Sequence, residues 1–278
     1  MKTRNEVVSS RNNPLVKWAA SLLDKKGREA SRAFIAEGEK LTFEAISASL
    51  PITHVFVSES KSKEFVSKLM LALDVPIYRD CELIMLSESA FSKISSEKSP
   101  QGVTCVIKYL DFFQKLDIIY KEEFCILPDE RAIALCSVRD PGNLGAVIRG
   151  AVAFGIDRLI LSADCADVYN PKTVRSAMGS LFRTRITTVS DFSSFVSVAK
   201  DIGRRVFAAE LSDKACPLSE VSLKKSDVII IGNEGHGIPS DISSMATGSV
   251  YIPISEKTES LNASVAASIF MWEQSKTV

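Results

Sequence analysis

Hydrophobic residues in the C-terminal half of the chain form short continuous runs instead of alternating patterns. The runs occupy residues 132–138, 158–161, 205–210, 227–232 and 250–254. Such runs are typical of central strands in a parallel sheet that helices cover on both faces. The stretches between them predict helices at 143–155, 171–179, 191–202 and 260–274. Residues 131–278 are therefore predicted to form an α/β domain with a mainly parallel sheet.

The first 110 residues predict a smaller α/β domain in which amphipathic helices alternate with strands. Asn13 and Pro14 open a helix that we expect to end near Gly27. Its apolar face consists of Leu15, Trp18, Ala19, Leu22 and Leu23. Strands are expected at 34–38, 53–58, 76–80 and 101–109, and further helices at 39–49 and 61–73. Residues 111–130 mix charged and aromatic residues without a clean period, so we expect the linker between the domains there.

Composition agrees with two globular domains, because the 278 residues are 46% hydrophobic and 24% charged. No apolar run approaches the roughly eighteen residues of a membrane span, and the first residues lack the apolar stretch of a signal peptide. We therefore expect a cytoplasmic protein without a membrane segment.

Cysteine and histidine give no sign of a metal site or of disulfide bonds, since no two cysteines form a CxxC pair. The interpretation that remains for the cysteines is small buried hydrophobic residues in a reducing compartment. The cysteines are Cys81, Cys105, Cys125, Cys136, Cys165 and Cys216, and the two histidines are His54 and His236.

Charge is unevenly distributed, although the formal net charge is zero. Residues 1–32 hold eight Lys and Arg against three acids, and residues 131–185 hold seven of the fourteen arginines. Local basic patches can bind nucleic acid even when the net charge is zero. The alternative is a solvated helix face with scattered surface arginines.

Candidate chemistry follows the strands, because ligands of parallel sheets bind beyond the carboxyl ends of the strands. The runs ending at 138, 232 and 254 lead into the polar loops RDPGNLG, NEGHGIP and SEKTESLN. The second loop has glycines like a phosphate-binding turn, but it fits neither GxxxxGK[ST] nor GxGxxG. Glu234 in this loop would repel a pyrophosphate. The loop therefore suits a neutral or cationic ligand better than a polyphosphate. A nucleotide-dependent oxidoreductase or kinase is accordingly disfavoured.

Together, the three loops resemble the motifs of the SpoU family of SPOUT, or trefoil-knot, RNA methyltransferases. The first motif, N-x-G-x-x-x-R, matches Asn143 to Arg149, and the second matches residues 231–235. The third matches Ile252 and Pro253, followed by residues 260–264. Residues 9–46 are similar to the substrate-recognition domain found ahead of the catalytic domain in one subgroup of this family.

The resemblance implies a fold and an activity that the patterns alone do not show. The last strand and helix would thread through a loop to form a deep knot, an exception to the rule against threaded chains. The N-terminal domain would be a small ribosomal-protein-like α/β domain that binds RNA. The enzyme would transfer a methyl group from S-adenosylmethionine to a ribose 2′-hydroxyl of RNA, as a homodimer joined by its C-terminal domains.

Site residues are carried over from the matching motif positions. Arg149 would orient a phosphate and stabilise negative charge on the 2′-oxygen, because a guanidinium cannot serve as a base. Asn143 and Glu234 would hold the loops, while Ser260 and Asn262 would have tasks besides helix capping. Backbone groups near Gly232, Ile252, Leu261 and Ala209 would bind the cofactor.

Each of these residues also has an ordinary structural interpretation. Arg149 could form a surface ion pair, Asn143 could cap the following helix, and Glu234 could be a solvated loop acid. Ser260 and Asn262 could be a redundant helix cap, and His236 is expected to have a structural or peripheral role.

RNA phosphates are expected to contact Arg139, Lys172 and Arg175, each of which could instead be ordinary surface. Nearby, Ala177 stands where relatives often carry a hydroxyl, which leaves that side chain without an expected role. The expected substrate is ribosomal RNA. Transfer RNA as the substrate, and an RNA-binding module without catalytic activity, remain as alternatives.

Overall fold

The computed structural model describes residues 1–117, 126 and 130–277. The chain divides into two compact units. Unit 1 comprises Met1–Leu110 and Asp167–Phe182, and unit 2 comprises Asp111–Ala166 and Arg183–Val278. The sequence predicted that each domain is one continuous segment, whereas in the structure residues 167–182 pack with unit 1.

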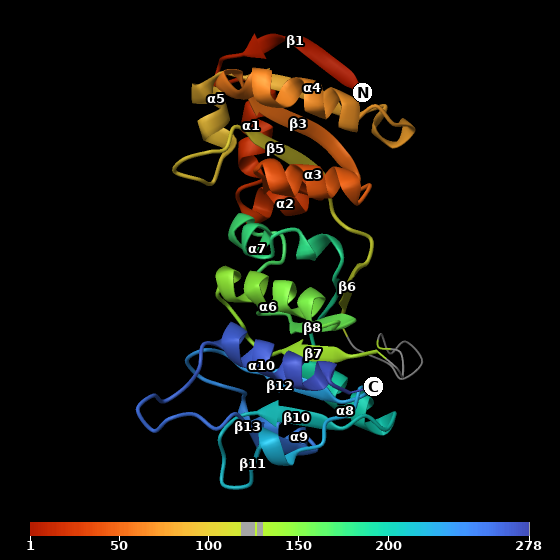
Figure 1. Cartoon of the computed structure of the whole chain (residues 1–278), viewed down its shortest axis with the longest axis vertical. Helices are drawn as coiled ribbons and strands as arrows, with labels where there is room; N and C mark the ends of the chain where they lie inside the picture. The colour runs from red at the N-terminus through yellow and green to blue at the C-terminus, as the bar shows by residue number, and fades with distance from the viewer. Residues whose placement is uncertain (118–125, 127–129, 278) are drawn as a thin grey trace. The chain divides into compact units, whose positions relative to one another are not determined.

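Unit 1 contains, within the described residues, a five-stranded sheet of order β1-β4-β3-β5-β2. Figure 1 labels β1, β3 and β5 of this sheet. β5 pairs antiparallel with β2 and β3, and the other neighbours are parallel. The strands are β1 (Lys2–Val8), β2 (Ala33–Glu37), β3 (Ile52–Ser58), β4 (Glu82–Leu86) and β5 (Val103–Lys108). The helices are α1 (Pro14–Ser21), α2 (Lys25–Ser31), α3 (Glu39–Ser47), α4 (Ser62–Ala72) and α5 (Glu88–Ile94).

Several elements of unit 1 differ from the sequence-based expectation. The expected helix from Asn13 to Gly27 breaks after Ser21, and Gly27 lies inside α2. A Cβ at Gly27 would lie 2.0 Å from the carbonyl oxygen of Ser21, so only glycine permits this close turn. The expected strand at 76–80 was wrong, because Pro76–Tyr78 form a 3₁₀ turn. β1, β4 and α5 were not predicted.

Helix α7 (Pro171–Ser176) contacts the edge strand β2 of unit 1. Covering an edge strand in this way protects its unpaired backbone groups. Val174, Ala177 and Leu181 of this segment are buried. The buried Arg28 holds the segment through an ion pair, in which its Nη2 lies 2.6 Å from Oδ2 of Asp167. Residues 167–182 are thus part of the core of unit 1.

Unit 2 contains, in the part of the chain that the structure describes, an eight-stranded sheet of order β11-β13-β10-β12-β7-β8-β9-β6. All neighbouring strands pair in parallel, which confirms the predicted mainly parallel sheet. The strands are β6 (Phe113–Leu116), β7 (Ala132–Leu135), β8 (Arg158–Ser162), β9 (Arg185–Val189), β10 (Val206–Ala209), β11 (Cys216–Pro217), β12 (Val228–Ile231) and β13 (Gly248–Tyr251). The helices are α6 (Pro141–Ala153), α8 (Phe192–Asp201), α9 (Ser240–Met245) and α10 (Ala263–Ser275).

The edges of unit 2 hold elements that the sequence did not predict. β9 was missed, and so was β6, which lies inside the expected linker and pairs with β9. The rest of that expected linker falls mostly outside the described residues. β13 ends at Tyr251, so residues 252–254, expected to be strand, belong to the following loop.

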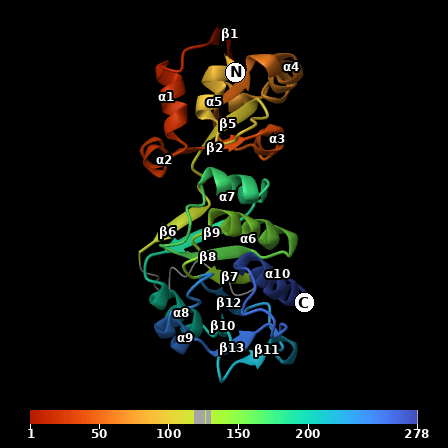
Figure 2. The same cartoon turned by 90° about the vertical axis from the view of Figure 1, so that its left-hand side faces the viewer.

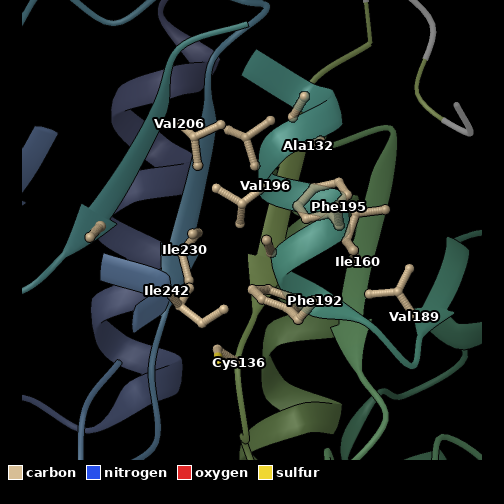
Figure 3. Close-up of a cluster of buried hydrophobic side chains, with 14 of the residues drawn as sticks. Ala132, Cys136, Ile160, Val189, Phe192, Phe195, Val196, Val206, Ile230 and Ile242 are labelled. Carbon is tan, nitrogen blue, oxygen red and sulfur yellow. The ribbon is translucent and has the colours of Figure 1, made fainter. Parts of the chain in front are cut away.

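Helices cover both faces of this sheet, which explains the continuous apolar runs of its strands. Figure 2 shows α8 and α9 on one face and α6 and α10 on the other. In Figure 3, Phe192 and Phe195 of α8 lie over side chains of β7, β8 and β12. The residues between those side chains along the strands, such as Ile133 and Ile229, are also buried. α10 returns from β13 to pack against β12 and α6, and the knot itself stays a prediction.

Two minor expectations can be compared with the structure. No helix among the described residues is long and apolar enough to cross a membrane. Cys81, Cys105 and Cys136 are buried as expected, and burial raises the pKa of Cys81 and of Cys136 to about 11. Cys216 is exposed, contrary to that expectation, and Cys125 lies outside the described residues.

Candidate active site at the carboxyl ends of the central strands

The first turn of α6 presents Asn143 beyond the carboxyl end of β7. The N-cap of α6 is Asp140, whose Oδ1 accepts a hydrogen bond of 2.9 Å from the backbone N–H of Asn143. Pro141 occupies the first turn, where its missing N–H costs nothing. The side chain of Asn143 is therefore not needed as the cap and is free to contact other loops.

Three polar side chains from distant parts of the sequence form one hydrogen-bonded chain. Asn143 Nδ2 donates to Glu234 Oε1 over 2.7 Å, and Asn262 Nδ2 donates to Asn143 Oδ1 over 3.0 Å. Asn262 also caps α10, because its Oδ1 accepts from the backbone N–H of Ser264 over 2.9 Å. The chain joins α6, the loop after β12 and the start of α10.

The loop after β12 is held closely by its own backbone. Asn233 and Gly237 exchange two backbone hydrogen bonds of 2.9 and 3.0 Å. A Cβ at Gly232 would lie 2.4 Å from the backbone carbon of Gly237, so only glycine fits. Asn233 Nδ2 donates to the carbonyl oxygen of Ser137 over 2.7 Å, which ties this loop to the end of β7.

Arg149 and Ser260 do not join the chain of Asn143, Glu234 and Asn262. Arg149 lies six residues after Asn143, which places it about 120° around the helix. It is exposed, and the structure gives it no hydrogen bond or ion pair within the described residues. Gly150 faces α10, where a Cβ would lie 2.8 Å from Met271 Cε. Ser260 is exposed as well, and its carbonyl oxygen accepts from the Thr258 hydroxyl.

A second polar cluster, which the sequence reasoning missed, lies beside the first. Asp164 Oδ2 accepts from Ser137 Oγ over 2.6 Å and from Arg139 Nη2 over 2.9 Å, while Oδ1 accepts from Ser162 Oγ over 2.6 Å. Partial burial raises the pKa of Asp164, but the two hydroxyls and the guanidinium outweigh it and lower the value to about 2. The signal that could have revealed this cluster is the polar residues directly after β7 and β8.

A pocket of about 440 Å³ opens next to this cluster. Its lining comes from the loops that follow β7 and β12. The lining residues are Ser137, Arg139, Asn233, His236, Gly237 and Pro239.

Comparison with known proteins identifies the family. The sequence model of the SpoU rRNA methylase family matches residues 130–272, and that of the MRM3-like substrate binding domain matches residues 13–105. The chain is 30% identical, over 96% of its length and 98% of the relative, to the 23S rRNA (guanosine(2553)-2′-O)-methyltransferase RlmP of Bacillus subtilis. The chain belongs to the SpoU rRNA methylase family.

Two further rRNA methyltransferases are similar to this chain. A 23S rRNA (uridine(2479)-2′-O)-methyltransferase of Streptomyces viridochromogenes is 24% identical over 96% of this chain and 90% of its own. The crystal structure of an AdoMet-bound rRNA methyltransferase from Sinorhizobium meliloti has a TM-score of 0.80 at 28% identity and covers 97% of both chains. The expected family, fold class and methyltransferase activity are thereby confirmed.

The residues expected to bind S-adenosylmethionine lie along one edge of the sheet. Ala209, Gly232 and Ile252 come at or just after the ends of β10, β12 and β13, which are neighbours in the order β13-β10-β12. Leu261 precedes α10, and all four residues are partly buried. Backbone groups and apolar side chains suit a neutral adenine ring, and the carboxylate of Glu234 suits a cationic sulfonium better than a phosphate. These residues therefore fit S-adenosylmethionine, the cofactor of this family.

The residues expected to contact phosphates lie in both units. Arg139 belongs to unit 2 and pairs with Asp164. Lys172 and Arg175 belong to α7 in unit 1, where Arg175 pairs with Glu97. Lys172 is exposed. Among the described residues, no group of His, Cys, Asp and Glu could hold a metal ion.

Proposed function

We propose that this methyltransferase methylates a ribose 2′-hydroxyl of large-subunit ribosomal RNA. The observation that carries the proposal is the hydrogen-bonded chain of Asn143, Glu234 and Asn262, built from all three SpoU motifs at one edge of the sheet. The substrate class is supported by the 30% identical relative, which acts on 23S rRNA. Its site of action in the cell would be the cytoplasm.

Positioning is the task of the three linked side chains. S-adenosylmethionine, when bound, would supply an electrophilic methyl group for the ribose 2′-oxygen, with S-adenosylhomocysteine as the leaving group and the hydroxyl proton released to solvent. Asn143 and Asn262 hold Glu234 and the start of α10 in fixed places, so the cofactor-binding loops keep one geometry. Arg149 orients a neighbouring phosphate and stabilises the negative charge that develops on the 2′-oxygen. Ser260 lies in the loop that precedes α10, and its hydroxyl would be available to the substrate or cofactor there.

A homodimer through unit 2 is supported by an exposed apolar stripe on α10. Val265, Ile269 and Trp272 recur at i, i+4 and i+7, and Val265 and Trp272 are 47% and 53% exposed. Val152 of α6 is also exposed, and Phe154 contacts the ring of Trp272. A second copy packed on this surface would bury the stripe and would enclose Arg149, which is exposed on the same helix as Val152.

RNA recognition is assigned to residues 1–110 together with α7, and methyl transfer to the rest of residues 131–278. The basic residues of 1–32 with Lys172 and Arg175 would contact phosphates in unit 1, and Arg139 would contact RNA in unit 2. Residues 111–130 would link the RNA-recognition domain to the methyltransferase domain. Binding by such contacts should weaken steeply with salt.

Transfer of a labelled methyl group tests the substrate class. Purified protein, S-adenosylmethionine and either unmodified large-subunit rRNA transcript or unmodified tRNA transcripts would be incubated in parallel. The proposal predicts label in rRNA only. Label in tRNA alone would overturn the assignment of rRNA as the substrate. Cofactor binding without transfer to either RNA would favour an RNA-binding module without activity.

A further inference from the structure

The pocket beside the active site has a prepared polar wall. Its arginine, Arg139, is held by Asp164, which also accepts from the hydroxyl of Ser137. Asn233 Nδ2 donates to the carbonyl oxygen of Ser137, so the β7 and β12 loops that line the pocket are joined. A donor held in a fixed place before binding loses little entropy when a ligand arrives.

The electrostatics of the pocket favour a neutral ligand. The charge of Arg139 is balanced by Asp164, 2.9 Å away, and Glu234 adds a further carboxylate in the adjacent loop. These carboxylates would repel a phosphate, whereas a nucleobase is neutral and would not be repelled. The guanidinium still has donors that the bond to Asp164 does not use.

The pocket also lies where the base of a bound nucleotide would reach. In the strand order β13-β10-β12-β7-β8, the cofactor residues follow the first three strands, and the pocket lies beyond β12 and β7. Glu234 follows directly after the pocket residue Asn233. Because the carboxylate of Glu234 suits the sulfonium of the methyl donor, the ribose that receives the methyl group would lie beside this residue, with its base within reach of the adjoining pocket. Sequence-specific recognition of RNA commonly uses unstacked bases that are splayed out and hydrogen-bonded at their edges.

The pocket offers donors from Arg139 and an acceptor from His236. Asn233 Oδ1 accepts from the backbone N–H groups of Gly235 and His236, so it is an acceptor. His236 Nδ1 lies 3.3 Å from the same oxygen and therefore carries the ring proton in this network. In this tautomer Nε2 is the acceptor of the ring, and His236 lines the same pocket as the donors of Arg139.

We propose that this pocket receives the base of the nucleotide to be methylated, and that Arg139 and His236 select guanine or uracil over adenine and cytosine. Guanine O6 with N1–H, and uracil O4 with N3–H, present an acceptor beside a donor. Adenine and cytosine carry an amino group at the position of that carbonyl and a bare ring nitrogen beside it. The inference rests on the proposed function, because it requires a ribose to be methylated next to the loop that holds Glu234.

The test compares four RNA transcripts that differ only at the methylated nucleotide. That nucleotide is first mapped in an unmodified large-subunit rRNA transcript treated with wild-type protein. Initial rates of methyl transfer are then measured for guanosine, uridine, adenosine and cytidine at this position. The variants are Arg139→Gln and, as a matched loss of one positive charge, Lys224→Gln, at an exposed residue in the loop before β12.

Wild-type protein should prefer guanosine or uridine by about 10-fold or more over adenosine and cytidine, as expected for a well-placed base contact. Arg139→Gln should remove most of this preference, whereas Lys224→Gln should keep it. Equal wild-type rates on all four transcripts would overturn the inference. So would an equal loss on all four with Arg139→Gln, which would indicate a phosphate contact. Absence of transfer by the wild-type protein would instead refute the proposed function.

Discussion

Asn143 has two hydrogen-bonding partners that require opposite ends of its amide. Its Nδ2 donates to Glu234, and its Oδ1 accepts from Asn262. Asn143→Asp keeps the acceptor but replaces the donor by an oxygen that faces a carboxylate. We expect methyl transfer to fall by about 100-fold, since each lost charge-assisted bond and the added repulsion cost roughly 1.5–3 kcal/mol.

The double variant N143D/E234Q separates the geometry of this bond from the charge of Glu234. The glutamine amide can donate to the new carboxylate, which restores a bond of reversed direction. Partial recovery over N143D, measured as the initial rate of methyl transfer, would indicate that Glu234 acts by positioning. A double variant as inactive as E234Q alone would show that its negative charge itself is required.

Arg149 is exposed and has no bond within the described residues, so its removal should leave the fold intact. Arg149→Ala should keep the affinity for S-adenosylmethionine within a few-fold and lower methyl transfer by about 100-fold or more. Arg149→Lys should also be poor, because lysine lacks the planar fork of the guanidinium. Calorimetry and transfer rates check both statements, and an equal loss of cofactor binding would contradict the assigned role.

At the scale of single elements, the turn after β12 depends on Gly232. A Cβ there would meet backbone atoms of Gly237 at 2.4 and 2.6 Å, which cannot move aside as a flexible side chain could. Gly232→Ala should therefore open the loop that holds Glu234 and weaken S-adenosylmethionine binding by about 10-fold or more. Gly248→Ala in β13 is the control, since its Cβ would meet only Phe207 at 3.8 Å. Equal cofactor affinity in both variants would contradict this account.

Helix α7 belongs to unit 1 through the ion pair of Arg28 and Asp167. Arg28 is 2% exposed, so loss of the carboxylate leaves a buried charge without its ionic partner. Asp167→Asn should lower the free energy of unfolding by about 3 kcal/mol. Asp80→Asn, in the exposed pair with Arg79, should change it by less than about 0.5 kcal/mol. Urea unfolding measures both, and equal small effects would show that α7 is held by apolar packing alone.

The elements that the sequence predicted well are those with a single strong signal. Residues 228–231 are continuously apolar, and β12 is buried on both faces. β9, RITTV, interrupts its apolar positions with threonines and was missed, although Thr187 is fully buried beside Arg158. The break between α1 and α2 depends on one close contact at Gly27, which no periodicity reveals.

The site shows the same limit. Asn143 and Asn262 are 119 positions apart, and only the family motifs suggested that they meet. Periodicity predicted the helix after β7 but could not say whether Asp140 or Asn143 caps it. The cluster at Asp164 carries no motif, so its bonds to Ser137 and Arg139 were visible only in the structure.

At the scale of the whole molecule, the dimer depends on the apolar stripe of α10. Sedimentation equilibrium should report twice 30.4 kDa at micromolar concentration. Trp272→Glu should give a monomer with much lower transfer activity, because a charge placed in an apolar interface is costly to desolvate. Leu71→Glu, at an 82% exposed position of unit 1, should remain a dimer. A fully active monomer would refute the dimer as the working form.

The position of the transferred methyl group tests the central claim most directly. Large-subunit rRNA transcript would be methylated with methyl-labelled S-adenosylmethionine and then hydrolysed completely in alkali. Alkaline cleavage requires a free 2′-hydroxyl, so a 2′-O-methyl group leaves its label in an uncleaved dinucleotide. We predict that all label appears in such dinucleotides. Label in mononucleotides would show methylation of a base and would contradict the proposed reaction.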